Sequence, residues 1–213
     1  MVANRPGGLP GMRVGIDLDN TLIDLDDLFF VQAVERGWFA AQPILDKTAV
    51  RDCLRQRESG ELLWQSLQAE IYGVTLRQAP LMAGADLFLR SCQAQGVTVF
   101  IVSHKTHYAG QEENRFDIRA TATQWLTEKG FFRAEGFGLA PENLFYESTR
   151  REKLARIAEL QLDCFIDDLP EVLTDPHFPH GVRPIWFNPA GRDALPGIVS
   201  CGHWLEMAAH VFV

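Results

Sequence analysis

Three side chains that can do chemistry, Asp17, Ser103 and Asp167, each follow directly after an apolar run that reads as a buried strand. In an open parallel sheet, the carboxyl ends of the strands form the crevice in which ligands bind. If these strands are neighbours, the three side chains meet at one place. Asp and Ser also favour helix N-caps, which would explain any one of them alone. The three together, with further acids at Asp19 and Asp168, favour a functional site.

Such a set of residues is suited to metal-assisted transfer of a phosphoryl group. Carboxylates gathered in one crevice repel one another, and a hard divalent cation such as Mg²⁺ removes that repulsion. A carboxylate such as Asp17 can attack phosphorus and form an acyl phosphate. A second acid two residues along, Asp19, can protonate the leaving group and then activate water. The Ser103 hydroxyl can hold the oxygens of the transferring group. The predicted metal ligands are Asp17, Asp19, Asp167 and Asp168.

The site also needs an ammonium group, and Lys153 is the favoured candidate. It falls in the first turn of a predicted helix, 150–160, that leads into the strand ending at Asp167. That position directs it toward the same crevice. Arg150 and Arg151 are rivals for the role, and a solvated surface lysine is the alternative.

Two further polar residues, His104 and Lys105, follow Ser103 directly. They are either substrate contacts or ordinary polar loop residues, because loops at strand ends carry both kinds. The stretch His107 to Arg115 is an unusually polar loop near the predicted site.

Elements that would position these residues alternate along the chain. Strands are predicted at Met12–Ile16, Val97–Val102, Asn143–Tyr146, Leu162–Ile166 and Val182–Phe187. Helices are predicted at Ala85–Gln95, Asp117–Lys129 and Arg150–Leu160, with a further amphipathic helix in His203–Val213. Short apolar strands alternating with helices predict an α/β fold with a parallel sheet covered on both faces.

The stretch from Asp24 to about Leu81 breaks this alternation. It contains no convincing strand, and apolar residues recur at helical spacing, as in Trp64, Leu67 and Ile71. It is too long for an ordinary loop between a strand and a helix. The sequence therefore predicts a core of residues 1–23 and 82–213, with a helical insert of residues 24–81 placed after the first strand.

Composition sets limits on the class of protein. The chain has 213 residues, 46% hydrophobic and 23% charged, with a formal net charge of -8. This balance argues against a nucleic-acid binder, which needs a basic face. The four cysteines are far apart and are expected to be buried free thiols. No apolar run is long enough to span a membrane, and Met1 to Gly11 lacks the apolar core of a signal peptide. A cytoplasmic protein is expected.

The motifs resemble those of the haloacid dehalogenase superfamily. The segment 16–22 (IDLDNTL) looks like its motif I, and the strand ending at Ser103 looks like motif II. Lys153 looks like motif III, and 165–171 (FIDDLPE) like motif IV. A bare DxD is a weak signal, but all four motifs in order across most of the chain are a strong one.

The resemblance implies a Rossmann-like core with its crevice at the strand ends and a small all-α cap of the C1 type. Asp17 would be the nucleophile and a metal ligand. Asp19 would be the acid/base, its backbone carbonyl also binding Mg²⁺, and Asp167 would complete the metal site with Asp168 or Glu171. The implied substrate-binding residues are Asn20, Ser103, His104, Lys105 and Lys153. An acid at position 19 favours phosphate chemistry, since the dehalogenases and phosphonatases of the family lack it.

Alternatives remain open at this point. A phosphomutase or a nucleotidase-like member would use the same acids, and the pair Asp167-Asp168 with Pro170 is similar to that of 5'(3')-deoxyribonucleotidases. A receiver domain is shorter and carries its acidic pair after the first strand. A non-catalytic phospho-ligand-binding protein and a protein–protein module are further alternatives. The expected partner is a small phosphorylated substrate, with no nucleic acid and no membrane, bound by a monomer or a homodimer.

Overall fold

The computed structural model describes residues 11–41, 43, 46–109 and 116–212. Residues 1–10 and the part of the polar loop from 110 to 115 lie outside the described residues.

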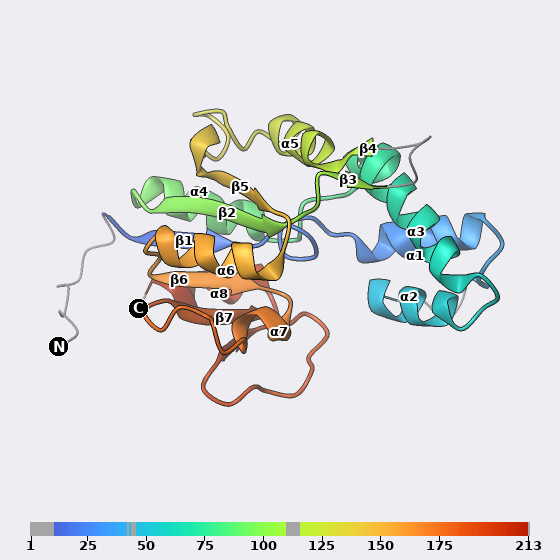
Figure 1. The fold of residues 1–213 in the computed structure, drawn as a ribbon. Coiled ribbons are helices and arrows are strands. Elements are labelled where there is room, and N and C mark those ends of the chain that lie inside the picture. Colours follow the sequence, from blue (N-terminus) through green and yellow to red (C-terminus); the bar gives the residue numbers. More distant parts are fainter. Residues whose placement is uncertain (1–10, 42, 44–45, 110–115, 213) are drawn as a thin grey trace.

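A six-stranded sheet forms the centre of the molecule, in the order β5-β2-β1-β6-β7-β8, with every neighbouring pair parallel (Figure 1). Its strands are β1 (Arg13–Ile16), β2 (Thr98–His104), β5 (Leu144–Glu147), β6 (Cys164–Asp167), β7 (Arg183–Phe187) and β8 (Val199–Cys201). The predicted α/β class and its five predicted strands are confirmed. β8 is a short edge strand that the apolar pattern does not predict.

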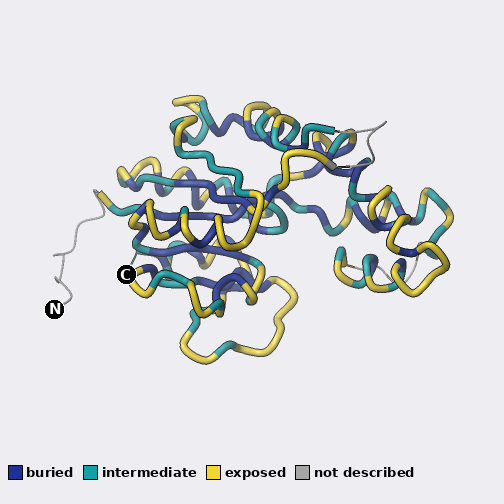
Figure 2. Tube along the Cα trace, viewed as in Figure 1, coloured by how far each residue is buried: buried dark blue, intermediate teal, exposed yellow. Residues whose placement is uncertain are grey.

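Helices cover both faces of the sheet. They are α4 (Ala85–Ala94), α5 (Ile118–Glu128), α6 (Arg150–Glu159), the short α7 (Pro170–Leu173) and α8 (Trp204–Val211). Because successive strand residues point to opposite faces, Ile101 of β2 joins the apolar cluster that contains Phe88 of α4 and Trp204 of α8. Its neighbours Phe100 and Val102 join the second cluster, which contains residues of α6 and α7. The four inner strands, β1, β2, β6 and β7, are accordingly buried through most of their length, whereas the edge strands β5 and β8 are more exposed (Figure 2).

Close packing at the central strand requires a glycine. A Cβ added to Gly15 of β1 would lie 2.3 Å from Cδ1 of Leu162 and 2.6 Å from the ring of Phe165. The missing side chain lets apolar residues of the adjoining segment close over the strand that carries Asp17.

The region after β1 is helical, as predicted, and no described residue between 24 and 80 belongs to a strand. It holds α1 (Asp26–Glu35), α2 (Lys47–Arg55), α3 (Gly60–Glu70), the π-helical turn η1 (Ile71–Thr75) and the 3₁₀ turn η2 (Leu76–Gln78). In Figure 1, α1, α2 and α3 lie together to one side of the sheet, away from the helices that cover its faces. Phe29 and Phe30 of α1 are buried, so they belong to a core and not to an exposed apolar patch.

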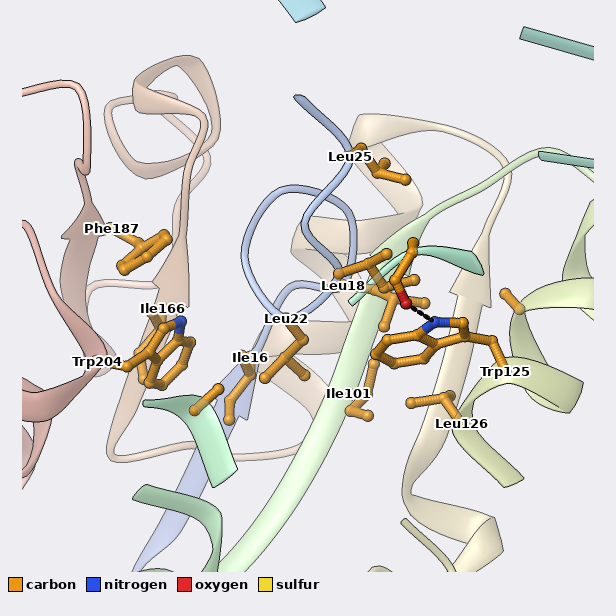
Figure 3. Packing of buried hydrophobic residues seen from close by; sticks show 14 of the residues in the cluster. Ile16, Leu18, Leu22, Leu25, Ile101, Trp125, Leu126, Ile166, Phe187 and Trp204 are labelled. Carbon is orange, nitrogen blue, oxygen red and sulfur yellow. Dashed lines mark hydrogen bonds between the residues drawn. The ribbon is translucent and has the colours of Figure 1, made fainter. Parts of the chain in front are cut away.

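The two chain segments that join this helical region to the sheet are fixed to each other and to the core. Asp24 N donates to Pro80 O at 3.1 Å, and Met82 N donates to Leu22 O at 2.7 Å. The buried indole of Trp125, on α5, donates from Nε1 to the carbonyl of Ala79 at 2.9 Å (Figure 3). These bonds hold the ends of the insert at fixed positions beside the core.

The remaining elements are two short strands and one 3₁₀ turn. β3 (Tyr108–Ala109) and β4 (Phe116–Asp117) pair antiparallel, and η4 (Pro141–Asn143) precedes β5. Of the cysteines, Cys92, Cys164 and Cys201 are buried free thiols, as predicted, while Cys53 is a half-buried free thiol. None of the described helices has the length and apolar character needed to cross a membrane.

Candidate active site

Asp17 directly follows β1, and Asp167 is the last residue of the neighbouring strand β6. One ammonium group contacts both carboxylates. Lys153 Nζ lies 2.5 Å from Oδ1 of Asp17 and 2.6 Å from Oδ2 of Asp167. All three side chains are almost wholly buried, at 5%, 0% and 1% exposure for Asp17, Asp167 and Lys153. The structure therefore brings Asp17, Asp167 and Lys153 together, as the sequence predicts.

The start of α6 explains how Lys153 reaches this place. Thr149 is the N-cap and accepts a hydrogen bond from Glu152 N at 3.1 Å, while the Glu152 carboxylate accepts from Thr149 N at 3.0 Å. This reciprocal pattern is a capping box, which fixes where a helix begins. Lys153 therefore lies in the first turn, at the edge of the sheet where β1 and β6 end.

A third carboxylate completes a set of oxygen ligands. Carboxylate oxygens of Asp17, Asp167 and Asp168 lie within 4.8 Å of one another. Backbone and side-chain donors orient two of them, since Leu169 N donates to Oδ1 of Asp167 at 2.9 Å and the Thr21 hydroxyl donates to Oδ1 of Asp168 at 3.4 Å. An all-oxygen set held at this spacing fits a hard divalent cation such as Mg²⁺.

The electrostatics of the group also favour a cation. Burial raises the pKa of Asp17 to about 7, Lys153 lowers it in part, and Asp167 raises it again. Burial, and then the charges of Asp167 and Asp17, raise the pKa of Asp168 well above its usual range. Burial disfavours the charged form of Lys153, but the two carboxylates that it contacts raise its pKa above the ordinary value. One ammonium therefore does not neutralise three carboxylates, and a bound cation would lower these carboxyl pKa values.

Asp19 lies apart from that group and has a lysine of its own. Lys105 Nζ donates to both carboxylate oxygens of Asp19, at 3.0 and 2.7 Å. Lys105 is 3% exposed, so this ion pair is shielded from water on the lysine side. Burial opposes ionisation of Asp19, but Lys105 and Lys47 hold the pKa of this carboxyl below its ordinary value. The Asp19 side chain is thus placed beside the carboxylate cluster and not within it.

The polar residues at the end of β2 have separate surroundings. Ser103 is 1% exposed and pairs in register with Tyr146. His104 is exposed, and its Nε2 lies 3.1 Å from the carbonyl of Ser148. Of the two residues that follow Ser103, the structure therefore brings Lys105 to the acids and turns His104 away from them.

Asn20 connects the loop after β1 to α1. It has a left-handed backbone, with φ of 57°, and its Nδ2 donates to Oδ1 of Asp26 at 3.2 Å. Its Oδ1 is buried and has no hydrogen-bond partner among the described residues. Glu171, the other candidate support for a metal, is exposed on α7 and is not part of the carboxylate group.

Two residues of the helical region also reach the site, and the motifs give no signal for either. Tyr72, in η1, is 7% exposed, and its hydroxyl interacts with the Asp19 carboxylate. Lys47, the first residue of α2, donates from Nζ to the Tyr72 hydroxyl at 2.9 Å. Burial, and then the charge of Asp19, raise the pKa of Tyr72 well above its usual range, so it stays a neutral phenol.

Known proteins resemble the chain in sequence and in fold. No protein-family model matches it. A protein of Bacillus cereus named "Putative nucleotidase" is 26% identical over 167 residues, which cover 76% of this chain and 79% of that protein. A protein of Oceanobacillus iheyensis that is also named as a nucleotidase is 24% identical over 170 residues, with the same two coverages.

Solved structures with the same fold cover nearly the whole chain. A haloacid dehalogenase-like family hydrolase from Xanthomonas campestris has a TM-score of 0.55 at 13% identity and covers 96% of both chains. A hydrolase of the same superfamily from Bacillus subtilis, bound to magnesium, has a TM-score of 0.55 at 16% identity, over 96% of this chain and all of that one. Another, from Deinococcus radiodurans with bound phosphate and sodium, has a TM-score of 0.56 at 17% identity, over 95% of both chains.

Proposed function

The chain has the fold of the haloacid dehalogenase superfamily hydrolases and their four motifs in order, and from this premise we propose that it is a magnesium-dependent phosphatase acting on a small phosphorylated metabolite. The observation that carries the proposal is the placement of Asp17. Its carboxylate and that of Asp167 both contact the Lys153 ammonium. Asp19, two residues further along the chain, is paired with a different lysine, Lys105.

The reaction proceeds in two displacements. An Asp17 carboxylate oxygen attacks phosphorus, and the bond from phosphorus to the ester oxygen breaks. Asp19, which is ionised beside Lys105 and must first take up a proton from solvent, gives that proton to the leaving oxygen. Asp19 then takes a proton from water, the water oxygen attacks phosphorus, and inorganic phosphate leaves with Asp17 restored. Ser103 and Lys153 hold the oxygens of the transferring group. Asp17, Asp167 and Asp168, with the backbone carbonyl of Asp19, would hold Mg²⁺, which supplies positive charge beside the phosphoryl oxygens when bound.

Residues 24–81 act, in this proposal, as a cap over a core of residues 1–23 and 82–213. Support comes from the two segments that connect this region to the core. They lie next to each other and are joined by the hydrogen bonds from Asp24 to Pro80 and from Met82 to Leu22. Support also comes from Tyr72, which belongs to the helical region and yet interacts with Asp19. A domain joined through two adjacent segments can close over a substrate and exclude water from the reaction.

Hydrolysis of p-nitrophenyl phosphate with and without Mg²⁺ tests the chemistry. We expect turnover that requires Mg²⁺ and is lost in Asp17→Asn, which keeps the shape of the side chain and removes the nucleophile. Asp52→Asn changes an exposed acid of α2 and serves as the control. Turnover by Asp17→Asn at the wild-type rate would rule out Asp17 as the nucleophile.

A nucleotidase is the second candidate, and the two sequence relatives named as nucleotidases are the observation that favours it. Phosphate release from nucleoside 5'- and 3'-monophosphates, measured beside release from sugar phosphates at equal concentration, separates the two possibilities. A kcat/KM for nucleotides above that for every sugar phosphate supports a nucleotidase. The reverse order supports a phosphatase of another metabolite class.

A further inference from the structure

Within the described part of the chain, the Lys47 ammonium forms no direct ion pair with a carboxylate, although its charge helps to hold the pKa of Asp19 low. Each ion pair there that involves a site lysine uses Lys105 or Lys153 and not Lys47. The Lys47 ammonium instead donates to the Tyr72 hydroxyl at 2.9 Å and lies 5.3 Å from the ring centre of Phe29 and 5.6 Å from that of Tyr72. It is a half-buried cation held against two aromatic rings by cation–π attraction.

Both ends of Lys47 are held by residues that interact with the loop after β1, which carries Asp19 and Asn20. Its backbone N–H donates to Oδ1 of Asp26 at 3.1 Å, and the same oxygen accepts Nδ2 of Asn20 at 3.2 Å. At the other end, the Tyr72 hydroxyl lies between the Lys47 ammonium and the Asp19 carboxylate. The position of Lys47 relative to Asp19 is therefore set by contacts on two sides.

Tyr72 itself separates two ammonium groups with different partners. Lys105 Nζ lies 4.4 Å from the centre of the Tyr72 ring and is paired with Asp19. Lys47 lies at the hydroxyl end of the same side chain and makes no direct ion pair among the described residues. Tyr72 lies in a π-helical turn, a local widening of the helix that is frequent at functional sites.

In the proposed mechanism, Lys47 lies on the leaving-group side of the site. In an in-line displacement, the leaving oxygen lies opposite the attacking oxygen of Asp17 and within reach of the acid, Asp19. In that arrangement, atoms of the substrate beyond the leaving oxygen would extend past Asp19. Tyr72 and then Lys47 come next in that direction, because Tyr72 contacts Asp19 and Lys47 contacts Tyr72.

We propose that Lys47, positioned by Tyr72 and Asp26, binds a second anionic group on the leaving-group part of the substrate. This inference rests on the proposed function and narrows the substrate class to phosphate esters whose leaving group carries a carboxylate or a further phosphate. A buried or half-buried ammonium forms strong charge-assisted hydrogen bonds to either group. A neutral nucleoside leaving group gives Lys47 no anion, so the inference separates the two candidate functions.

Matched substrate pairs test it. Within each pair, only the second anionic group differs: 3-phosphoglycerate against glycerol 3-phosphate for a carboxylate, and glucose 1,6-bisphosphate against glucose 6-phosphate for a phosphate. We call the member with the second anionic group the charged member and the one without it the neutral member. The readout is kcat/KM for the charged member divided by kcat/KM for the neutral member. We expect wild type to prefer the charged member of at least one pair, and Lys47→Met to lower that ratio about 10- to 100-fold, the loss of one hydrogen bond to a charged group. Lys47→Arg should keep most of the ratio.

Two controls separate the role of Lys47 from a general effect. Lys129→Met is the matched substitution, because Lys129 is also half-buried and lies 5.6 Å from the centre of an aromatic ring, that of Trp125, at the end of α5. It should leave the ratio as in wild type. Tyr72→Phe removes the hydroxyl that positions Lys47 and should raise KM for the charged member more than for the neutral one.

A binding measurement keeps this test independent of turnover. In the Asp17→Asn background, the rise in melting temperature caused by each member of a pair is compared with and without Lys47→Met. Greater stabilisation by the charged member, lost with Lys47→Met, supports the inference even where no substrate is turned over. Equal stabilisation by both members of both pairs, or equal loss on charged and neutral members with Lys47→Met, would overturn it. Absence of turnover with every ester, including p-nitrophenyl phosphate, would count against the proposed phosphatase alone.

Discussion

The ammonium nitrogen of Lys153 lies 2.5 Å from Oδ1 of Asp17, although α6 and β1 are separated by more than half of the chain. Both side chains are buried, and Asp167 shares the same ammonium. Lys153 is therefore a structural counter-ion as well as a group that can hold phosphoryl oxygens, and the two roles can be measured separately.

Lys153→Met tests the structural role. Removing the ammonium leaves buried carboxylates without their partner, a change that costs about 3–5 kcal/mol of unfolding free energy in known cases. We expect the metal-free variant to be destabilised by an amount of that order and Mg²⁺ to stabilise it more than it stabilises wild type. Urea unfolding with Mg²⁺ and with a chelator measures both, and Lys129→Met is the control. A variant as stable as wild type in chelator would contradict this role.

The pH dependence of stability follows from Asp17. Its pKa is raised by burial from 3.8 to about 7, so between these values the folded, metal-free protein holds a proton that the unfolded chain has lost. This contribution to stability is complete below pH 3.8 and is lost as the pH rises through about 7. Mg²⁺ binds the ionised carboxylates, so its stabilising effect grows over the same interval. Thermal unfolding with and without Mg²⁺ at pH 5.5 and pH 8 checks this, and an equal Mg²⁺ effect at both pH values would contradict it.

Lys105→Met tests the control of Asp19. Lys105 donates to both oxygens of that carboxylate and helps to hold its pKa low, against the effect of burial. Without the lysine, the pKa of Asp19 rises, so the limb of the pH–rate profile that reports Asp19 moves to higher pH. His104→Ala, an exposed neighbour, is the matched control and should leave the profile in place. A lower rate with an unshifted profile would mean that Lys105 acts on the substrate alone.

Gly73→Ala tests the position of the π-helical turn. A Cβ at Gly73 would lie 2.3 Å from Cγ of the Phe116 ring, so either the turn that carries Tyr72 or Phe116 must shift. Overpacking of this kind costs about 1–3 kcal/mol. We expect a lower melting temperature together with a higher KM. Gly181→Ala is the control, because nothing lies within 4 Å of a Cβ there. Equal melting temperatures for the two variants would show that the turn adapts freely.

The strands that carry Asp17, Ser103 and Asp167 are predictable because each is a local apolar run with a polar residue at its end. β8 is not, since Val199–Cys201 is three residues at the edge of the sheet and only its pairing with β7 defines it. The sequence alone also did not distinguish His104 from Lys105 as a substrate contact. They differ because His104 ends the strand facing outward, whereas Lys105 comes after it and turns to Asp19.

Tyr72 and Lys47 were not predictable for a different reason. Their relation to Asp19 depends on where the helical region lies beside the sheet, and no spacing within that region records it. Lys47 begins α2 and Tyr72 lies in a π-helical turn after α3, so neither belongs to a motif. Residues of this kind are found only from the assembled structure.

The central position of β1 also has a consequence for synthesis of the protein. One neighbour of β1 is β2, but the other is β6, and Arg13 N donates to Asp163 across 150 positions of chain. A growing chain that ends before β6 leaves β1 with one unpaired edge and Asp17 without its lysine and its neighbouring acid. Contacts between such distant residues form late, since the long loop between them must first be closed. Asp17, the proposed nucleophile, thus leaves the ribosome well before Lys153 and Asp167 and reaches its final surroundings only after they have been made.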